Sequence, residues 1–239
     1  MKRILVTGGS RGIGAAIVRA FTARGDRVAF LYRSNHAAAA SIAAETGATP
    51  ICCDVSDPDS VHTAFAAATS ALGGAPEVLV NNAGIAESAL SRDIADAAWR
   101  RMLDTNLSAA FYLSREAQPA MIAAKAGRII NIGSMWGKVG ASMEVAYSTA
   151  KAGLRGLTMA IAKELGPSGI TVNCIEPGVI DTEMTAFLDE ETRHELCDST
   201  PLCRIGTTDE VASAVCFLAS DGAAFITGQI LGVDGGFAI

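Results

Sequence analysis

The amino-acid sequence predicts an α/β fold: a single domain built on a doubly wound, seven-stranded parallel sheet with helices on both faces. Half of the 239 residues are hydrophobic, which is enough apolar material for a large core. Short apolar runs alternate with longer Ala-rich amphipathic segments, a pattern typical of parallel sheets buried on both faces. No Pro- or Ser-rich linker divides the chain and it holds no internal repeat, so we expect one domain over residues 1–239.

Seven short apolar segments are the predicted strands, because each is bounded by turn-forming or polar residues. In chain order they are Ile4–Val6, Arg27–Tyr32, Thr49–Cys53, Val78–Val80, Arg128–Ile132, Thr171–Ile175 and Ile230–Val233. The longer segments between them carry apolar residues at helical spacing. The predicted helices are Ile13–Ala23, Ala37–Glu45, Ser60–Leu72, Ala98–Ala124, Ala150–Leu165 and Glu210–Ala219.

The charge balance argues against nucleic-acid binding. The chain has 19 Lys and Arg against 25 Asp and Glu, a net charge of −6 and no basic run. No segment reaches the ~18 apolar residues of a membrane span, and the apolar run near the N-terminus stops at Thr7, too early for a signal peptide. We therefore expect a soluble, cytoplasmic protein that binds neither nucleic acid nor membranes.

The six cysteines form neither a metal-binding nor a disulfide pattern. Cys52 and Cys53 are adjacent, no C-x-x-C pair occurs, and the three histidines lie far apart in the sequence. We expect free thiols in a reducing compartment and no metal site.

A glycine-rich turn follows the first predicted strand. Gly8, Gly12 and Gly14 stand between this strand and the next predicted helix, in the spacing G-x-x-x-G-x-G. Glycines at this point of a parallel sheet let the backbone approach a diphosphate, which then sits on the helix N-terminus. Close packing alone also produces such turns.

The end of the second strand bears on the choice of cofactor. A carboxylate there favours the free ribose hydroxyl of NAD, whereas an arginine favours the 2′-phosphate of NADP. This strand ends with Arg33, and Arg11 in the glycine turn is a second nearby cation, so NADP(H) is predicted. Asp54 ends the third strand and is placed to reach the adenine; it would otherwise cap the next helix, for which Asp57 is the better candidate.

Tyr147 and Lys151 are four residues apart, which places them on one face of a helix. A phenol has a pKa near 10, and a neighbouring ammonium together with a positively charged nicotinamide favours its phenolate. Lowering that pKa by ~3 units requires ~4 kcal/mol, within reach of two cations in a dry cleft. An ordinary surface Tyr/Lys pair has the same spacing.

Other polar residues follow predicted strands at their carboxyl ends, where ligands of parallel sheets bind. Ser134 follows the fifth strand, Asn82 and Gly84 the fourth, and Gly178 the sixth. Asn106 lies within the long predicted helix Ala98–Ala124, where an Asn either bends the helix and holds a water or is tolerated surface polarity.

Together these motifs resemble the short-chain dehydrogenase/reductase family. The resemblance covers essentially the whole chain: T-G-x-x-x-G-x-G at 7–14, N-N-A-G at 81–84, Asn106, Ser134, Y-x-x-x-K at 147–151 and P-G at 177–178. It implies a Rossmann-type sheet and hydride transfer between nicotinamide C4 and a carbonyl carbon.

The resemblance also implies the roles of individual residues. Tyr147 would donate the proton, and Ser134 would hydrogen-bond the carbonyl oxygen. Lys151 would bind the nicotinamide ribose and lower the pKa of Tyr147, and Asn106 would order a proton-relay water. The implied cofactor-binding residues are Gly8, Ser10, Arg11, Gly12, Ile13, Gly14, Arg33, Asp54, Val55, Asn82, Ala83, Gly84, Tyr147, Lys151, Pro177, Gly178, Ile180 and Thr182.

Within the family, residues 175–184, 204–206, 217–221 and 225–228 resemble bacterial 3-oxoacyl-[acyl-carrier-protein] reductases. The resemblance implies NADPH-dependent reduction of a 3-oxoacyl thioester by a homotetramer that takes a small-molecule or carrier-bound substrate. Arg128 fits one position that docks the acidic carrier near the mouth of the site, whereas Ser168 stands where that subfamily can have a basic residue.

Two other interpretations stay open. Residues 134–145 are similar to reductases that act on an aminopentanone modification of elongation factor P, and Glu144 would pair there with a substrate amine, unless it is a solvated loop charge. Another small ketone or alcohol is a further alternative substrate, after the 3-oxoacyl thioester. The predicted substrate lid, about 184–202, is acidic, which does not suit an acidic carrier. A non-catalytic NADP sensor is disfavoured because the catalytic tetrad is intact.

Overall fold

The computed structural model describes residues 1–183, 185 and 189–238. Seven parallel strands form one sheet in the order β3-β2-β1-β4-β5-β6-β7, which confirms the predicted fold class. The strands are β1 (Arg3–Thr7), β2 (Arg27–Tyr32), β3 (Thr49–Cys52), β4 (Val78–Asn81), β5 (Gly127–Ile132), β6 (Ile170–Pro177) and β7 (Ile230–Val233).

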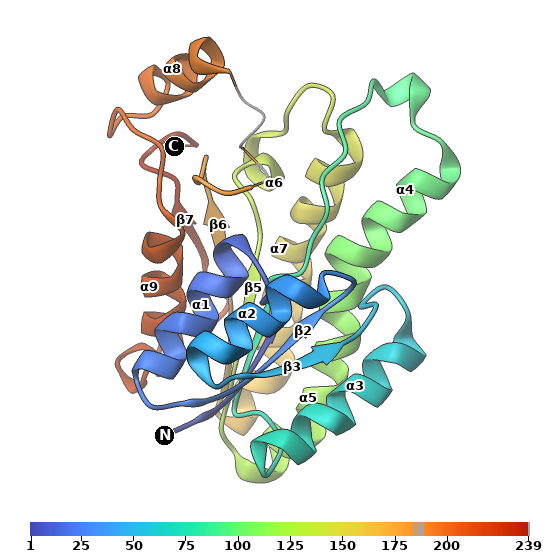
Figure 1. Cartoon of the computed structure of the whole chain (residues 1–239), viewed down its shortest axis with the longest axis vertical. Helices are drawn as coiled ribbons and strands as arrows, with labels where there is room; N and C mark the ends of the chain where they lie inside the picture. The colour runs from blue at the N-terminus through green and yellow to red at the C-terminus, as the bar shows by residue number, and fades with distance from the viewer. Residues whose placement is uncertain (184, 186–188, 239) are drawn as a thin grey trace.

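Helices cover both faces of this sheet (Figure 1). The helices are α1 (Gly12–Ala23), α2 (His36–Thr46), α3 (Pro58–Leu72), α4 (Asp96–Leu103), α5 (Ala109–Ala124), α6 (Trp136–Val139), α7 (Val145–Leu165), α8 (Glu190–Asp198) and α9 (Thr208–Leu218). Alternate strand residues point to opposite faces. Ile4 and Val6 of β1 therefore pack in a core with α1, α2 and α9, while Leu5 packs in a second core with α3, α5 and α7.

The prediction of one continuous helix over Ala98–Ala124 is wrong in one respect. The chain forms α4 and α5 with a π-helical segment, Asp104–Ser108, between them. Such segments are rare and occur frequently at functional sites. The widened turn contains Asn106, whose side chain leaves the helix to bond the loop after β4.

The predicted helix Ala150–Leu165 starts too late. In the structure α7 begins at Val145, so Tyr147 lies in its first turn. The preceding Glu144 makes no side-chain capping bond, and this helix start therefore has no residue signature that the sequence could reveal. Two helices were not predicted: α6 is a single turn, and α8 has almost no apolar residues.

The predicted lid over about 184–202 falls partly outside the described residues, at positions 184 and 186–188. Its described part carries α8, which is capped by Asp189 accepting from the Thr192 amide at 2.8 Å. Beyond α8, the Leu202 amide donates to Gly235 near the C-terminus at 3.2 Å. A lid function for this segment stays a prediction.

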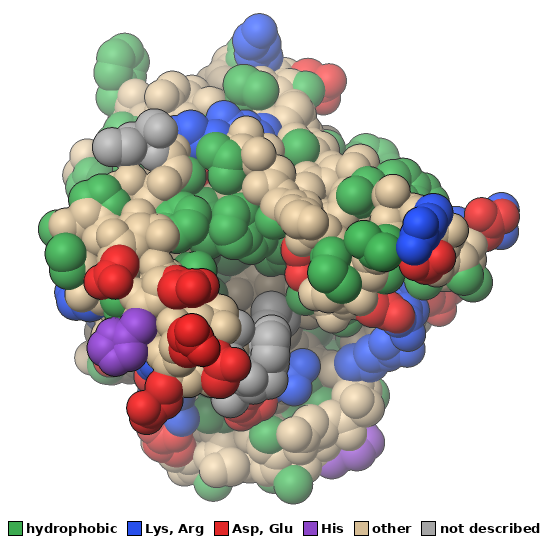
Figure 2. Space-filling view, turned by 90° about the horizontal axis from the view of Figure 1, so that it is seen from above, with side chains coloured by type: hydrophobic (Ala, Val, Ile, Leu, Met, Phe, Trp, Pro, Cys, Tyr) green, Lys and Arg blue, Asp and Glu red, His purple; other side chains and the backbone are tan. Residues whose placement is uncertain are grey.

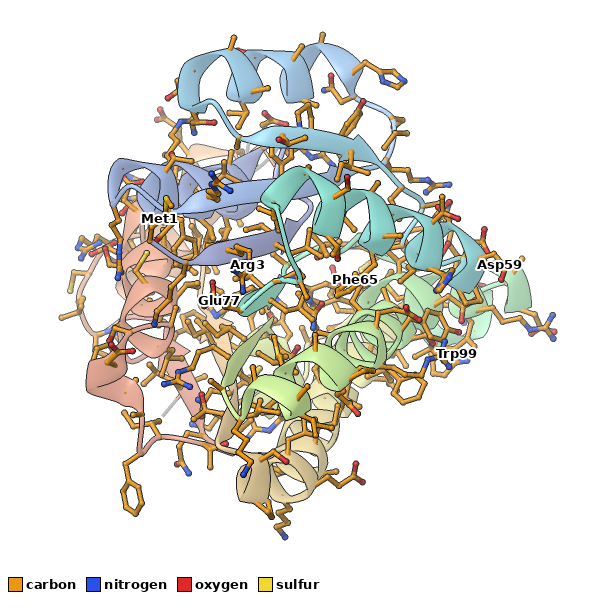
Figure 3. The ribbon with its side chains drawn as sticks, turned by 90° about the horizontal axis from the view of Figure 1, so that it is seen from below. Met1, Arg3, Asp59, Phe65, Glu77 and Trp99 are labelled. Carbon is orange, nitrogen blue, oxygen red and sulfur yellow. The ribbon has the colours of Figure 1, made fainter. Side chains whose placement is uncertain are left out.

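The two ends of the strands differ in the groups that lie there. We call the side with the strands' amino ends the amino edge and the side with their carboxyl ends the carboxyl edge. The amino ends of the strands lie at the N-terminal side of the molecule, where Arg3 pairs with Glu77 at 3.5 Å (Figure 3). The carboxyl ends face α6 and α8 (Figure 1). Within the described residues, no helix has the length and apolarity needed to cross a membrane, and all six cysteines are free thiols.

Candidate active site

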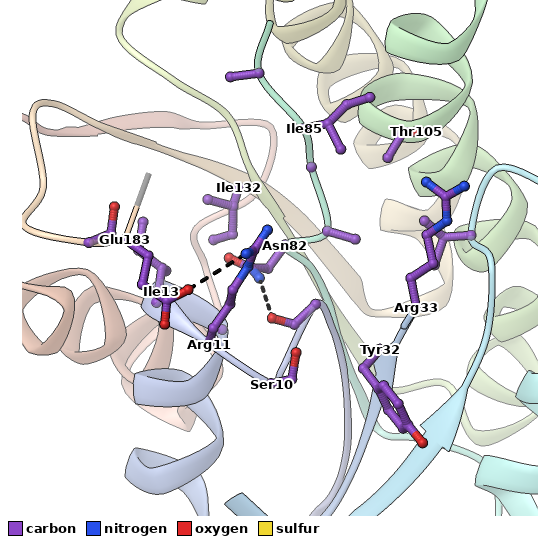
Figure 4. Close-up of a pocket in the computed structure, with 18 of the residues that line it drawn as sticks. Ser10, Arg11, Ile13, Tyr32, Arg33, Asn82, Ile85, Thr105, Ile132 and Glu183 are labelled. Carbon is purple, nitrogen blue, oxygen red and sulfur yellow. Dashed lines mark hydrogen bonds and ion pairs between the residues drawn. The ribbon is translucent and has the colours of Figure 1, made fainter. Parts of the chain in front are cut away.

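One large cavity opens at the carboxyl ends of the strands, and its volume is about 590 Å³. Every residue predicted to bind the cofactor lines this cavity, and so does Ser134 (Figure 4). Two predicted site residues are absent from the lining: Asn106, which lies behind it, and Glu144, which was predicted to pair with a substrate amine. The topology thus brings together residues from six of the seven strand ends.

The glycine turn after β1 has a shape that larger residues would prevent. Gly8 and Gly12 adopt positive φ angles of 67° and 51°. Gly14 is required for a different reason, because a Cβ there would lie 2.1 Å from the Gly8 carbonyl oxygen. Asn82 fixes this turn to β4, since its side-chain amide donates to the carbonyls of Thr7 at 2.9 Å and Gly8 at 3.3 Å.

The first turn of α1 is available to an anion. Arg11 occupies the N-cap position in extended backbone, and its side chain makes no capping hydrogen bond. Without a side-chain acceptor, the leading N–H groups of a helix favour a phosphate. The cavity, the tight glycine turn and this open helix end fit the diphosphate of a dinucleotide.

Two arginines, Arg11 and Arg33, line the cavity (Figure 4), and each pairs with a carboxylate. Arg11 lies 3.6 Å from Glu183, and Arg33 lies 3.2 Å from Asp54; both guanidinium groups are more than half exposed. Burial raises the pKa of Asp54, but hydrogen bonds from Ser56 and the charge of Arg33 outweigh it and lower the pKa overall. Both arginines are therefore exposed cations that a ribose phosphate can contact.

Asp54 does not cap a helix. The prediction that Asp57 is the cap of α3 is confirmed, since its carboxylate accepts from the amides of Asp59 and Ser60. Asp54 instead accepts from the Ser56 amide and hydroxyl at 3.0 and 2.6 Å, which holds its carboxylate at the cavity wall.

Tyr147 and Ser134 face each other at the inner end of the cavity. Ser134 follows β5, is buried, and its hydroxyl oxygen accepts from the Trp136 amide at 3.2 Å. Burial raises the pKa of Tyr147; the hydrogen bond with Ser134 lowers it in part, and the charge of Glu144 raises it further. The expected lowering is thus not found in the protein by itself, and the phenol is held in its protonated form.

Lys151 is buried one helical turn beyond Tyr147. Its ammonium donates to the Ile132 carbonyl at 2.8 Å and lies 5.7 Å from the centroid of the Tyr147 ring. Burial lowers the pKa of Lys151 to about 8. The ammonium is therefore held at the end of β5 and lies beside the Tyr147 ring.

Asn106 connects the π-helical segment to the loop after β4. Its side-chain nitrogen donates to the Ile85 carbonyl at 3.0 Å and to the Met102 carbonyl at 3.1 Å, and its oxygen accepts from the Ile85 amide at 3.2 Å. A Cβ on Gly84 would lie 2.6 Å from this oxygen, so only glycine fits there. Asn106 thus shapes the wall of the cavity through the main chain of Ile85.

Some contributors to the site were not identified from the sequence. Ile132 and Ile85 act through backbone carbonyls, which every residue type carries, so no residue signal marks them. Thr105 and Glu183 also line the cavity. Each is the sequence neighbour of a predicted site residue, Asn106 or Thr182, and the sequence has no other signal that would identify them. Arg128 was placed wrongly: it lies at the amino end of β5, where its backbone amide donates to the Glu77 carbonyl, on the edge opposite the cavity.

Comparison with known proteins finds relatives over the full chain. A family model described as enoyl-(acyl carrier protein) reductase matches residues 8–238. The chain is 41% identical to the 3-oxoacyl-[acyl-carrier-protein] reductase FabG of Escherichia coli over 237 residues, covering 98% of this chain and 96% of that protein. It is 38% identical over 238 residues to the 3-oxoacyl-[acyl-carrier-protein] reductase MabA of Mycobacterium tuberculosis, covering 100% and 93%.

Solved structures agree closely with the fold. A putative gluconate dehydrogenase from Agrobacterium tumefaciens has a TM-score of 0.95 at 33% identity, covering 99% of this chain and 96% of that one. A blue fluorescent protein from a metagenomic library, solved in complex with NADPH, has a TM-score of 0.93 at 38% identity, covering 100% and 98%.

Proposed function

The chain belongs to the short-chain dehydrogenase/reductase family, and from that premise we propose that it reduces the ketone of a 3-oxoacyl thioester with NADPH. It is an oxidoreductase of this family, and its cofactor is NADP(H). The observation that carries the proposal is the meeting of Ser134, Tyr147 and Lys151 at the inner end of a cavity with a dinucleotide cradle.

The cavity residues fit NADP(H) along its length. The glycine turn and the N-terminus of α1 would hold the diphosphate, and Arg33 with Arg11 would hold the 2′-phosphate. Gly84, Ile132 and Lys151 would surround the nicotinamide end. The solved relative that contains NADPH has the same fold over its whole length.

Bound NADPH supplies the hydride. The chain supplies the proton and the geometry: the Ser134 hydroxyl holds the carbonyl oxygen, and Tyr147 donates its phenolic proton to that oxygen as negative charge develops. A raised pKa suits this role because it keeps the phenol protonated until it reacts. Lys151 then stabilises the phenolate with its buried ammonium.

The 3-oxoacyl thioester is supported by the names of the curated relatives. Whether a carrier protein docks is less well supported by this chain, since Arg128 is on the far edge of the sheet. We therefore propose the thioester as the chemical class, presented free or on a carrier. A second candidate, an amino-ketone such as the aminopentanone group on elongation factor P, is favoured by one observation: a buried carboxylate oxygen of Glu144 has no hydrogen-bond partner among the described residues.

A homotetramer and a cytoplasmic location are further proposals. Apolar side chains stand exposed on α5, at Phe111 and Ile122, and near the C-terminal strand, at Phe225 and Leu231. Such side chains would be covered if α5 and the C-terminal strand formed subunit contacts, which is why we propose these surfaces. Sedimentation of the purified protein measures the assembly directly.

The test of the proposed function is NADPH oxidation by the purified protein with acetoacetyl-coenzyme A as the ketone. We expect turnover with NADPH and little with NADH. The proposal is refuted if no ketone in a panel of thioesters, free ketones and amino-ketones oxidises NADPH.

A further inference from the structure

A buried ion pair joins helix α7 to the carboxyl end of strand β6. The Nη1 group of Arg155 donates to both carboxylate oxygens of Glu176, at 2.9 and 2.7 Å. The Glu176 side chain is 4% exposed and that of Arg155 is 29% exposed. A carboxylate buried to this degree is costly unless it is paired, so the position of Glu176 depends on Arg155.

Glu176 is next to both main-chain groups of β6 that hold the turn of Ser134. Two hydrogen bonds, of 2.7 and 3.0 Å, connect the turn to the strand, and in each an amide beside Ser134 donates to a carbonyl beside Glu176. They join Gly133 to Ile175 and Met135 to Pro177. The turn that carries the Ser134 hydroxyl is therefore bonded to β6 on both sides of Glu176.

The Glu176 side chain also packs against this turn. Gly133 is buried directly before Ser134, and a Cβ on it would lie 3.0 Å from Cγ of Glu176 and 2.9 Å from Sγ of Cys174. The backbone of Gly133 thus rests on these two side chains without space between them. A movement of the Glu176 side chain would therefore move the turn and with it the Ser134 hydroxyl.

Arg155 extends this connection to the helix of the proton donor. Tyr147, Lys151 and Arg155 follow one another at four-residue intervals, which places them on one side of α7. Tyr147 bonds Ser134 at the inner end of the cavity, and Arg155 bonds Glu176 two turns further along. Helix α7, strand β6 and the turn after β5 are thus joined in a closed loop of contacts.

The ion pair acts from outside the cavity. In the view onto the carboxyl edge the surface is hollowed (Figure 2), and the cavity opens there. Glu176 is 3% exposed, and neither it nor Arg155 belongs to the residues that line the cavity. A bound ketone would therefore not contact the pair, whose effect on the reaction has to pass through the main chain of the turn.

We propose that Glu176, held by Arg155, is a positioning residue that sets the Ser134 hydroxyl against the phenol of Tyr147. This role rests on the ketone reduction proposed above and adds two residues to it. Misplacing a reacting group by about 1 Å can slow a reaction about 10²-fold. A loosened turn should therefore slow hydride transfer, while NADPH binding, which uses the glycine turn and the arginines, should not change.

The test replaces the pair by two methionines, Arg155→Met with Glu176→Met, which leaves no buried charge unpaired. Such replacements are often neutral or stabilising, so the melting temperature should not fall. We expect single-turnover hydride transfer from NADPH to acetoacetyl-coenzyme A to slow about 10- to 100-fold, with the Kd for NADPH unchanged. The matched control is Arg19→Met with Glu45→Met, a pair that joins α1 to α2 at 2.7 and 2.8 Å and should leave the rate unchanged.

A second comparison separates positioning from a general effect on the fold. In Ser134→Ala there is no hydroxyl to misplace, so adding the methionine pair should slow the reaction no further. Equal slowing in both backgrounds, or an unchanged rate in the wild-type background, would show that Glu176 does not position Ser134. If the methionine pair lowers the melting temperature, Glu176→Gln, which keeps the shape and removes the charge, takes its place with the same expectations.

A failure of the proposed function would give a different result. If the wild type oxidises NADPH with no ketone of the panel, ketone reduction is wrong, and crystal structures of the wild type and the methionine variant then test the positioning role. The hydrogen bond between Ser134 and Tyr147 should be lengthened or lost in the variant. An unchanged bond would overturn the role of Glu176.

Discussion

The two edges of the sheet differ in which groups their polar side chains contact. At the amino edge, the Arg3 amide donates to Glu77 at 3.0 Å and its guanidinium to the Ala75 carbonyl at 2.7 Å, while Lys2 bonds the Ala219 carbonyl (Figure 3).

At the carboxyl edge, the Lys151 ammonium donates to the Ile132 carbonyl and the Asn82 amide to the Thr7 carbonyl, so side chains there hold the backbone that lines the cavity. Buried atoms without a partner among the described residues occur at both edges, for example Glu144 Oε2 at the carboxyl edge and Arg128 Nε at the amino edge.

Individual cations and glycines at the two edges also differ. Lys151 is a buried ammonium whose pKa is lowered to about 8 at the carboxyl edge, whereas Lys2 at the amino edge pairs with Asp221 at 3.1 Å. A Cβ on Gly14 would meet a backbone oxygen, but one on Gly25, before β2, would meet no atom within 4 Å. The amino edge therefore contributes stability, and the carboxyl edge gives up stability for binding and chemistry.

Substituting one glycine at each edge should show the largest difference between the edges in cofactor affinity. Gly14→Ala forces the Gly8 carbonyl to move out of the cradle, and we expect the Kd for NADPH to rise by about 100-fold or more. Gly25→Ala places alanine at a φ of 80° in open space and should cost about 1 kcal/mol of stability. Titration of cofactor fluorescence and urea unfolding measure the two effects. Equal NADPH affinity in both variants would contradict the assignment of the cradle.

The second-largest effect is expected from substituting Arg33, the arginine that we propose binds the 2′-phosphate of NADPH. Arg33→Asp replaces a cation by a carboxylate, and we expect KM for NADPH to rise about 10- to 100-fold while NADH is used relatively better. Arg92→Asp, an exposed change of the same charge in the turn Ser91–Asp93, is the control and should leave both cofactors unaffected. Equal use of NADPH and NADH by the wild type would contradict the proposed role of Arg33 in selecting NADPH.

How far the sequence predicts the structure also differs between the edges. The strand order and the cavity lining follow from motifs whose residue types are required by chemistry, such as Tyr147 with Lys151 or the glycines after β1. The π-helical segment, the start of α7 at Val145 and the helix α8 were not predictable, because no strong cap or apolar pattern marks them.

The sequence indicates which charged group lies beside Tyr147, but not the direction in which the pKa of this phenol shifts. The sequence pairs Tyr147 with a cation, yet burial raises the pKa of the phenol, and the charge of Glu144 adds to this effect. The Lys151 ammonium donates to the Ile132 carbonyl. Backbone acceptors and burial are properties of the tertiary structure, so a sequence pattern alone cannot rank them. The pairing of Arg3 with Glu77 joins strands distant in sequence and was invisible for the same reason.

The buried ammonium predicts a pH dependence. Between about pH 8 and the usual pKa of Lys near 10.4, the unfolded chain binds a proton that the folded protein has released, so wild-type stability rises with pH. Relative to Lys151→Met, the wild type should gain about 1 kcal/mol per pH unit in this window. Urea unfolding at several pH values measures the difference in the free energy of unfolding between the wild type and Lys151→Met. If this difference did not change with pH, Lys151 would have its ordinary pKa.

The smallest effect is expected at the amino edge. Glu77→Gln removes the charged partner of Arg3 from a half-exposed pair, and we expect a loss of about 1 kcal/mol or less in the free energy of unfolding. Turnover should be unchanged, because the strands separate this pair from the cavity. A fall in kcat without loss of stability would show that the edges are not independent.

The most direct test of the account is single-turnover hydride transfer from bound NADPH to a ketone in wild type and Tyr147→Phe. The substitution removes only the hydroxyl, so we expect the rate to fall about 10²- to 10⁴-fold while NADPH affinity and thermal stability stay close to wild type. An unchanged rate in Tyr147→Phe would contradict the assignment of this phenol as the proton donor at the carboxyl edge.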